Sequence, residues 1–260
     1  MRKIHVIGIG AGDPDHLTLQ AVKAMKDTDV FFILDKGEEK ADLVELRRGM
    51  LDAHRPDGAY RVVEATDPPR DRDRSAGGTA YASAVDDWRR LRAEVYERMI
   101  TDELGDDGTG AFLVWGDPAL YDSTIAILEE VLGHGRVAFD YDVVPGVSSV
   151  SALAARHRVG LNRVARPFQI TTGRRLADEG IPDGVDDVVV MLDARQAFQR
   201  YADRDDIDIY WGAYIGTPDE ILASGPVSEA APRIERLREQ ARERKGWIMD
   251  TYLLRRRDDA

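Results

Sequence analysis

A short unbroken run of hydrophobic residues near the start of the chain predicts a buried β-strand. Residues 4–9 read I-H-V-I-G-I, a run too short to cross a membrane and rich in β-branched side chains. This composition favours a strand that is covered on both faces. Alternate glycines over residues 8–12 let the chain turn tightly after the strand, and Thr18 is the predicted N-cap of an amphipathic helix.

Apolar strands and helix-spaced segments alternate through the first half of the chain. The predicted elements are strands at 29–34, 60–65 and 111–115, and helices within 36–51, 79–104 and 123–132. Residues 66–78 combine two prolines and two glycines with alternating charges. This composition predicts a mobile loop.

The second half repeats the alternation without repeating the sequence. Its predicted elements are strands at 136–144, 168–172, 188–192, 207–212 and 221–224, helices at 149–157, 195–202 and 232–245, and a closing edge strand at 247–254. Strands that alternate with helices in both halves predict two α/β domains. The Gly/Pro-rich loop after residue 116 is the predicted boundary, which gives domains 1–116 and 117–260.

Composition and charge exclude several classes of function. The chain of 260 residues has no cysteine, which excludes disulfides, thiol catalysis and thiolate metal sites, and its five histidines lack the spacing of metal ligands. A net charge of −12 opposes binding to nucleic acid or to anionic membranes. Without a predicted membrane span or leader, the protein is expected in the cytoplasm.

The glycine loop invites comparison with a dinucleotide-binding fingerprint, and it fails at the third glycine. Counting G-x-G-x-x-G from Gly8 places Asp13 where close packing of the helix requires glycine, and Pro14 then removes a backbone donor. A carboxylate at this position repels a pyrophosphate. Asp35 does follow the second strand at a suitable distance. A dinucleotide site and a purely structural tight turn therefore both stay open at this point.

Polar and glycine-rich loops follow several predicted strands, in positions where α/β proteins bind ligands. They read G-I-G-A-G-D-P at 8–14, W-G-D-P-A-L-Y at 115–121, V-P-G-V-S-S at 144–149, M-L-D-A at 191–194 and I-G-T-P-D at 215–219. Such loops gather at the carboxyl ends of the strands in open α/β sheets.

This set of loops, in this order, resembles the tetrapyrrole methylase family. The resemblance implies two α/β domains with an inter-domain cofactor cleft, S-adenosyl-L-methionine as cofactor, no metal and a homodimer. L-D-K-G at 34–37, W-G-D-P-A-L-Y-D-S-T at 115–124 and Q-I-T-T-G-R-R at 169–175 resemble the branch that acts on precorrin-5 in cobalamin synthesis. That branch methylates ring carbon C1, and the C20 acetyl group leaves as acetate.

The resemblance implies a set of site residues. The cofactor contacts fall on Ala11, Trp115, Gly116, Asp117, Leu120, Ser148, Ser149, Met191 and Gly216. Two features depart from the family pattern: Ala11 stands where many relatives have proline, and Leu192-Asp193 follows the methionine. A sulfonium cofactor is a cation that needs backbone polar groups, a carboxylate and apolar walls rather than a phosphate cradle. The N-terminal domain is assigned to the substrate and the C-terminal domain to the cofactor.

Chemistry beyond methyl transfer needs further residues, because loss of an acetyl group requires an activated water. Asp13 is the candidate base and Tyr121 a candidate donor, with an Asx-turn or helix cap as the structural alternative for Asp13. Arginines are expected to bind the carboxylate arms of the substrate. Arg174 and Arg175 are the first candidates, and the arginines of the loop 66–78 (Arg70, Arg72 and Arg74) are others unless they merely face solvent.

Three alternatives remain at this stage. The chain can be another member of the same family, such as a different precorrin C-methyltransferase or a diphthine synthase. It can be a dinucleotide-dependent oxidoreductase built on Gly8 to Gly12 and Asp35, or a non-catalytic protein that binds a nucleoside cofactor. Nothing in the sequence indicates a nucleic-acid partner.

Overall fold

The computed structural model describes residues 1–35, 41–69 and 78–257. These residues form two compact units, each with its own five-stranded sheet. The first unit contains residues 1–10 and 14–147, and the second contains residues 11–13 together with the chain from residue 148 onward. The division lies after Val147 rather than at residue 116, because the strand after the Gly116 loop pairs with the first strand of the chain and so completes the first sheet.

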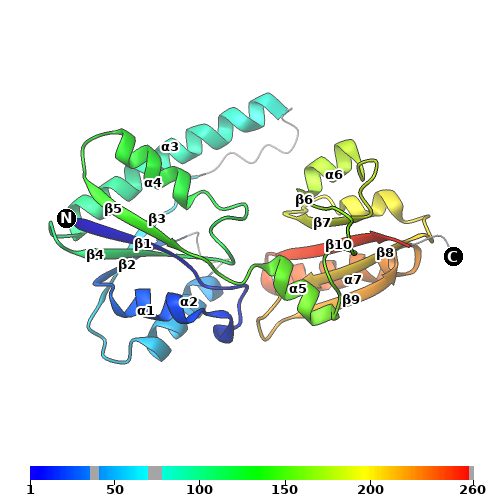
Figure 1. Ribbon diagram of the computed structural model, residues 1–260, viewed down its shortest axis with the longest axis horizontal. Coiled ribbons are helices and arrows are strands. Elements are labelled where there is room, and N and C mark those ends of the chain that lie inside the picture. The colour runs from blue at the N-terminus through cyan, green and yellow to red at the C-terminus, as the bar shows by residue number, and fades with distance from the viewer. Residues whose placement is uncertain (36–40, 70–77, 258–260) are drawn as a thin grey trace. The chain divides into compact units, whose positions relative to one another are not determined.

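The first unit is a parallel α/β sheet with strand order β3-β2-β4-β1-β5 (Figure 1). Its elements are β1 (Arg2–Gly8), a 3₁₀ turn η1 (Pro14–His16), α1 (Leu19–Lys26), β2 (Val30–Asp35), α2 (Ala41–His54), β3 (Arg61–Thr66), α3 (Gly78–Glu103), β4 (Thr109–Val114), α4 (Thr124–Gly133) and β5 (Phe139–Val144). Every strand pair in this sheet is parallel, so the carboxyl ends of all five strands lie along one edge.

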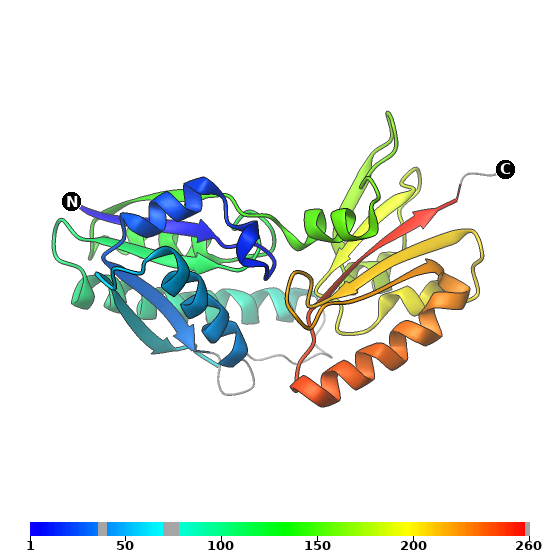
Figure 2. The same ribbon diagram turned by 90° about the horizontal axis from the view of Figure 1, so that it is seen from below.

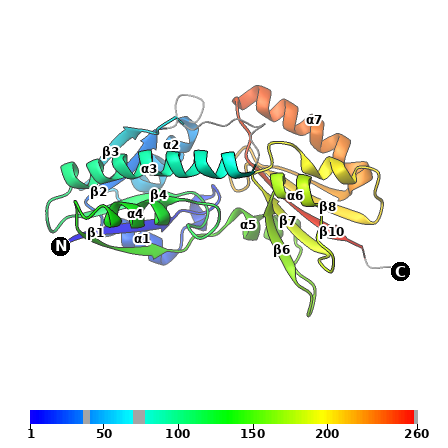
Figure 3. The same ribbon diagram turned by 90° about the horizontal axis from the view of Figure 1, so that it is seen from above.

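Helices cover both faces of the first sheet. Figure 1 shows α1 and α2 on one side of the strands and α3 and α4 on the other, and Figure 3 shows the second pair from above. The alternation of buried side chains along β1 follows from this arrangement. Ile4 and Val6 pack toward α3 and α4, whereas Ile7 and Ile9 pack toward α1 and α2. Two separate apolar layers therefore hold the strand ends in register.

The second unit contains a mixed sheet with strand order β6-β7-β10-β8-β9. Its elements are α5 (Ser149–His157), β6 (Phe168–Thr172), α6 (Gly173–Glu179), β7 (Asp187–Met191), a 3₁₀ helix η3 (Ala197–Tyr201), β8 (Ile207–Ala213), β9 (Ile221–Pro226), α7 (Val227–Lys245) and β10 (Asp250–Arg256). The helices α6, η3 and α7 pack on one face, and α5 packs against β8 and β10 on the other (Figure 2).

Most of the predicted elements are present within a few residues of their predicted bounds. The Thr18 cap is confirmed, because its side-chain oxygen accepts a hydrogen bond from the Ala21 N–H at 3.0 Å. The long helix predicted at 79–104 is α3. Part of the predicted loop is outside the described residues, and so are Arg70, Arg72 and Arg74.

Four predictions about the second unit differ from the structure. The segment predicted as an edge strand is β10, which lies in the middle of the sheet with Tyr252, Leu253 and Leu254 fully buried. The helix predicted to start at Pro232 starts at Val227, since burial of its first turn outweighs the hydrogen bond that the proline gives up. The helix predicted at 195–202 is the short η3, and α6 was not predicted.

Candidate functional site

Three strand-end loops of the first unit meet at the carboxyl edge of its sheet. Gly8 ends β1, Gly116 follows β4 and Gly146 follows β5. Their backbones approach so closely that a Cβ atom on Gly146 would lie 2.1 Å from the Gly116 carbonyl oxygen, and one on Gly8 would lie 2.6 Å from the Gly146 nitrogen. Any side chain at Gly8 or Gly146 would clash with the neighbouring loop, so the close contact between the loops requires glycine at both positions.

The loops after β1 and β4 form a switch point of the sheet. These two strands are neighbours, yet the chain leaves β1 toward α1 and leaves β4 toward α4, on opposite faces. Gly10 and Gly116 connect the two loops through a pair of backbone hydrogen bonds of 3.3 and 2.8 Å, and both glycines have positive φ. In open α/β sheets, this is where ligands bind.

Asp117 has a structural task at this switch point. Its Oδ1 accepts a hydrogen bond from the Ala119 N–H at 2.7 Å, and its Oδ2 accepts one from the Gly146 N–H at 3.2 Å. The carboxylate thus ties the loop after β4 to the loop after β5. Leu120 continues the same turn, because its N–H donates to the Asp117 carbonyl at 3.1 Å.

Tyr121 stands out by its backbone and its exposure. Its φ is +51°, a conformation that a bulky residue rarely adopts, and 48% of the residue is exposed. Leu192 in the second unit has the same combination, with φ +55° and 63% exposure. Such strained residues gather at functional sites, which makes both candidates for contact with a ligand.

Several predicted cofactor residues of the second unit lie along one edge of its sheet. Met191 at the end of β7 is paired with Thr251 of β10, which is in turn paired with Gly212 near the end of β8. The Ser149 hydroxyl contacts the Thr251 hydroxyl at 3.3 Å. Ser148 is the N-cap of α5, and its oxygen accepts a hydrogen bond from the Ser151 N–H at 3.1 Å.

The segment Ala11–Asp13 packs on the turn that follows β8. A Cβ atom on Gly12 would lie 2.6 Å from the Thr217 methyl carbon and 3.1 Å from the Ile215 carbonyl oxygen. Ala11 is buried, whereas Asp13 is partly exposed and has an interaction partner. Gly216 has φ +79°, and its N–H donates to Glu220 Oε2 at 2.9 Å. The predicted residues Ala11, Met191 and Gly216 therefore belong to the same unit.

A buried polar network supports the turn after Met191. Asp193 is 4% exposed and accepts hydrogen bonds from the Arg195 and Ala197 N–H groups and from the Tyr252 hydroxyl, the last at 2.6 Å. Arg238 of α7 donates to the Asp193 carbonyl at 3.0 Å and forms an ion pair with the buried Asp250. The sequence shows these residues only as scattered charges, so this network was not predicted.

The predicted substrate arginines follow β6. Arg175 is exposed and forms a bidentate ion pair with Glu179, with Nε–Oε1 and Nη2–Oε2 distances of 3.1 and 2.9 Å. Arg174 is partly buried and also has an interaction partner. Because Thr172 pairs with Met191 in the sheet, both arginines start from the edge that carries the predicted cofactor residues.

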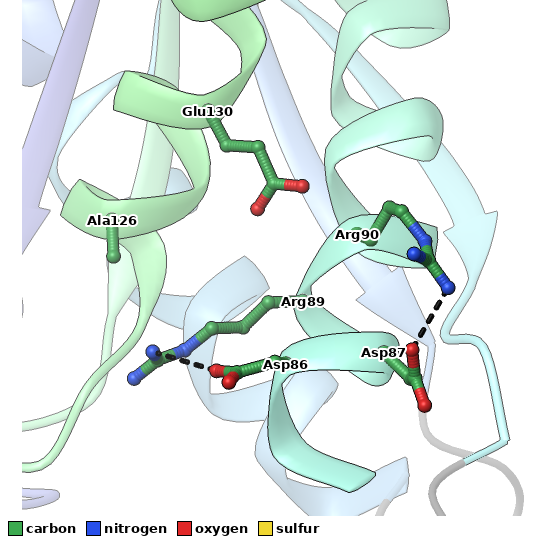
Figure 4. Close-up of a pocket in the computed structure, with 6 residues that line it drawn as sticks. All are labelled: Asp86, Asp87, Arg89, Arg90, Ala126 and Glu130. Atoms are coloured by element: carbon green, nitrogen blue, oxygen red, sulfur yellow. Dashed lines mark hydrogen bonds and ion pairs between the residues drawn. The ribbon is translucent and has the colours of Figure 1, made fainter. Parts of the chain in front are cut away.

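A surface hollow between α3 and α4 is a different feature (Figure 4). Asp86, Asp87, Arg89, Arg90, Ala126 and Glu130 line it. Arg90 pairs with Asp87 at 2.8 Å and Arg89 with Asp86 at 3.7 Å, so its charges largely satisfy one another. No predicted site residue lines this hollow. It therefore gives no reason to move the candidate site away from the strand-end loops.

The described residues contain neither a cluster of metal-binding side chains nor a helix that could span a membrane. Among residues 1–35, 41–69 and 78–257, no group of three or more histidine, aspartate or glutamate side chains is placed to hold a metal ion. No helix within the same ranges is both long and apolar enough to cross a bilayer.

Comparison with known proteins identifies the family. The family model for tetrapyrrole (corrin/porphyrin) methylases matches residues 3–231. The chain belongs to this family. It is therefore a methyltransferase with two α/β units, as its strand-end loops predict, and the dinucleotide alternative is not supported.

Relatives that match nearly the whole chain agree with this family. A precorrin-6A synthase (deacetylating) from Sinorhizobium sp. is 51% identical over 259 residues, which cover 100% of this chain and 97% of the relative. The crystal structure of a cobalamin-synthesis-related protein, CobF, from Corynebacterium diphtheriae has a TM-score of 0.82 and 37% identity, and covers 99% of this chain and 100% of that one.

A more distant structure shows the shared fold. It is a uroporphyrin-III C-methyltransferase from Thermus thermophilus complexed with S-adenosylhomocysteine. Its TM-score is 0.54 at 19% identity, with 97% of this chain and 96% of that chain covered. At this identity the likeness concerns the fold alone.

Proposed function

We propose that this chain is an S-adenosylmethionine-dependent C-methyltransferase that acts on precorrin-5, methylates ring carbon C1 and releases the C20 acetyl group as acetate. The observation that carries the proposal is the 51% identity to a precorrin-6A synthase (deacetylating) over the whole chain. The contacts between the loops 8–10, 115–118 and 145–146 support it, because they hold three loops together at the switch point of the first sheet, where open α/β sheets generally bind ligands.

The second unit has residues that fit the nucleoside part of the cofactor. Ala11, Met191 and Gly216, with the exposed Leu192, present apolar side chains and bare backbone at or near one edge of the sheet. This chemistry suits an adenosine with a sulfonium group rather than a phosphate. Ser148 is engaged as a helix cap, so its backbone is the part available to the cofactor.

Methyl transfer depends on positioning. When bound, S-adenosylmethionine supplies the electrophilic methyl group, and the protein has to hold the ring carbon in line at a distance of about 3 to 3.5 Å. The ties between Gly10, Gly116, Asp117 and Gly146 fix the loops of the first unit before any ligand arrives. Preorganisation of this kind lowers the entropy that must be lost in the reaction.

Deacetylation requires water to attack the acetyl carbonyl while the ring carbon keeps the electron pair of the broken bond. Asp13 is proposed to accept the proton of that water, and Tyr121 to donate a hydrogen bond to the developing oxyanion. Asp13 is partly exposed and Tyr121 is half exposed, so neither side chain is sealed in a core.

The proposal also covers the substrate arginines, the roles of the two units and the state in which the protein works. Arg174 and Arg175 are assigned to substrate carboxylates, although Arg175 would first have to give up part of its pairing with Glu179. The loops of the first unit are assigned to the substrate and the sheet edge of the second unit to the cofactor. A cytoplasmic homodimer without a nucleic-acid partner is the expected working state.

The test is incubation with precorrin-5 and methyl-labelled S-adenosylmethionine, with label in the macrocycle and released acetate measured together. Equal amounts of both products are expected. Label without acetate would indicate a different precorrin C-methyltransferase of the same family. Absence of both products, with S-adenosylhomocysteine still bound, would overturn the assigned substrate.

Asp13→Asn tests the proposed base, with Asp15→Asn as the matched control two residues further along, in the 3₁₀ turn η1. Asp13→Asn is expected to reduce acetate release by about 100-fold or more, the usual contribution of a positioned base, while S-adenosylhomocysteine affinity stays unchanged. Wild-type rates of methylation and acetate release in Asp13→Asn would remove Asp13 from the mechanism.

A further inference from the structure

Arg47 of α2 is an unusual arginine within the first unit. Its Nε donates to the Leu113 carbonyl at 3.2 Å and its Nη1 donates to the Leu43 carbonyl at 3.0 Å. Leu113 lies at the carboxyl end of β4, one residue before that strand ends. The side chain therefore reaches from the helix to the strand-end edge of the sheet, where its position is fixed by two backbone carbonyls.

The charge of Arg47 has no carboxylate partner within ion-pair distance in the part of the chain that the structure describes. Other arginines of this unit are paired: Arg48 with Glu64, Arg55 with Asp57 and Arg92 with Asp67. Arg47 is partly buried, and burying a guanidinium without a counter-charge costs free energy. Such a group is expected where an anion from outside the chain completes the pair.

The ionisation of Arg47 agrees with this geometry. Burial lowers the pKa of its guanidinium to about 10, and the neighbouring Tyr96 and Asp122 act in the opposite direction. At neutral pH the group is still charged. A bound carboxylate would supply the counter-charge that the guanidinium lacks.

Trp115 provides a second, independent observation at the same place. The Arg47 guanidinium lies over its indole ring, 5.8 Å from the ring centroid. The indole Nε1–H is buried and has no hydrogen-bond partner in the described residues. A buried donor without a partner is rare, and it indicates a ligand or an ordered water. Trp115 directly precedes Gly116, so both donors lie beside the switch point.

We propose that Arg47 and the indole N–H of Trp115 form a carboxylate-binding subsite, and that it takes a carboxylate arm of the tetrapyrrole. The assignment to the tetrapyrrole rests on the proposed function. The aminocarboxylate group of S-adenosylmethionine has the same chemistry and is the other source of a carboxylate. An arginine fork beside a neutral N–H donor suits either one.

The experiment compares Arg47→Met with Arg48→Met, which removes the adjacent exposed arginine that is already paired with Glu64. Three sets of measurements are made: kcat and KM for the tetrapyrrole, the affinity for S-adenosylhomocysteine, and the affinity for a stable polycarboxylate porphyrin. Arg47→Met is expected to raise the tetrapyrrole KM and the porphyrin Kd by about 10- to 100-fold, with a smaller change in kcat. Arg48→Met is expected to leave all three unchanged.

Two further variants separate binding from folding. Arg47→Lys keeps the charge and is expected to recover part of the porphyrin affinity. Trp115→Phe keeps an aromatic ring beside the guanidinium and removes the N–H donor together with the five-membered ring of the indole. Trp115→Phe is expected to weaken porphyrin binding by up to about tenfold. Urea unfolding of each variant identifies any loss that comes from structure alone.

The outcomes distinguish the source of the carboxylate. A selective loss of porphyrin and tetrapyrrole affinity assigns the subsite to the macrocycle, and a selective loss of S-adenosylhomocysteine affinity assigns it to the cofactor. Unchanged affinity for all three ligands in folded Arg47→Met would overturn the subsite. Porphyrin binding does not depend on turnover, so it tests Arg47 even if wild-type protein fails to methylate precorrin-5.

Discussion

Asp117 and Gly146 are joined across two loops, because one carboxylate oxygen of Asp117 accepts the Gly146 N–H at 3.2 Å. The other oxygen accepts the Ala119 N–H at 2.7 Å. The sequence predicts that this carboxylate contacts a cationic cofactor. In the structure both of its oxygens already have backbone donors, so its role in ligand binding is proposed to work through the shape of the loops.

Asp117→Ala removes both hydrogen bonds and leaves two N–H groups without acceptors. It is expected to lower the free energy of unfolding by about 2 to 3 kcal/mol, since each bond to a charged group contributes about 1.5 to 3 kcal/mol and the site is partly solvated. S-adenosylhomocysteine affinity is expected to fall with it. Urea unfolding and calorimetric titration measure the two effects. Asp140→Ala, an exposed aspartate on β5, is the control, and equal losses in both variants would contradict the role given to Asp117.

Gly146→Ala places a methyl carbon only 2.1 Å from the Gly116 carbonyl oxygen. Because a backbone atom cannot move aside cheaply, the loops after β4 and β5 have to separate. The variant is expected to lose about 1 to 3 kcal/mol of stability and most of its methyl transfer. Gly133→Ala is the control, since a Cβ atom there meets nothing within 4 Å. Full activity in Gly146→Ala would show that the close approach of the loops is not needed.

Local patterns explain why much of this fold could be predicted. The β-branched run over 4–9 and the Thr18 cap act over a few residues, so they can be recognised without knowledge of the rest of the chain. The strand-end loops could be recognised for the same reason. Their mutual contacts could not, because the approach of Gly146 to Gly116 depends on β5 pairing with β1 across the sheet.

Contacts between residues far apart in the sequence explain why other predictions differ from the structure. β10 alternates in sequence like an edge strand, yet it is inserted between β7 and β8 and is buried on both faces. Arg47 looks like any polar residue of an amphipathic helix. Only the structure shows its guanidinium beside Trp115 at the end of β4.

The pair Arg238 and Asp250 gives a prediction about pH. Burial raises the pKa of Asp250, while Arg238 and the Trp211 indole N–H lower it. Arg238→Met removes the cation and so raises this pKa further. The fold is expected to lose about 3 to 5 kcal/mol at pH 8, where Asp250 is left charged and unpaired.

The loss in Arg238→Met is expected to shrink as the pH falls. A carboxyl group whose pKa is higher in the folded than in the unfolded state stabilises the fold at low pH and loses this contribution as pH rises through the folded pKa. Urea unfolding at pH 8 and pH 5 measures the difference from wild type, and the exposed Arg236→Met is the control on the same helix. A loss of the same size at both pH values would contradict this account of the pair.

His157 gives the opposite dependence on pH. Burial lowers the pKa of its imidazole, and its Nε2 lies 3.0 Å from the Trp211 carbonyl oxygen, which it can bond only as a donor. A base whose folded pKa lies below its unfolded value of about 6.5 stabilises the fold above that value and loses this contribution as pH falls. Wild-type stability is therefore expected to decline between pH 7.5 and pH 5.5.

His157→Gln keeps a side-chain N–H donor and removes the titration. Its stability is expected to be slightly lower than wild type at pH 7.5, because the glutamine packs less well against Tyr210, and to decline less toward pH 5.5. Urea unfolding across this range compares the slope of His157→Gln with that of wild type. An unchanged slope in His157→Gln would mean that other groups cause the decline in stability with falling pH.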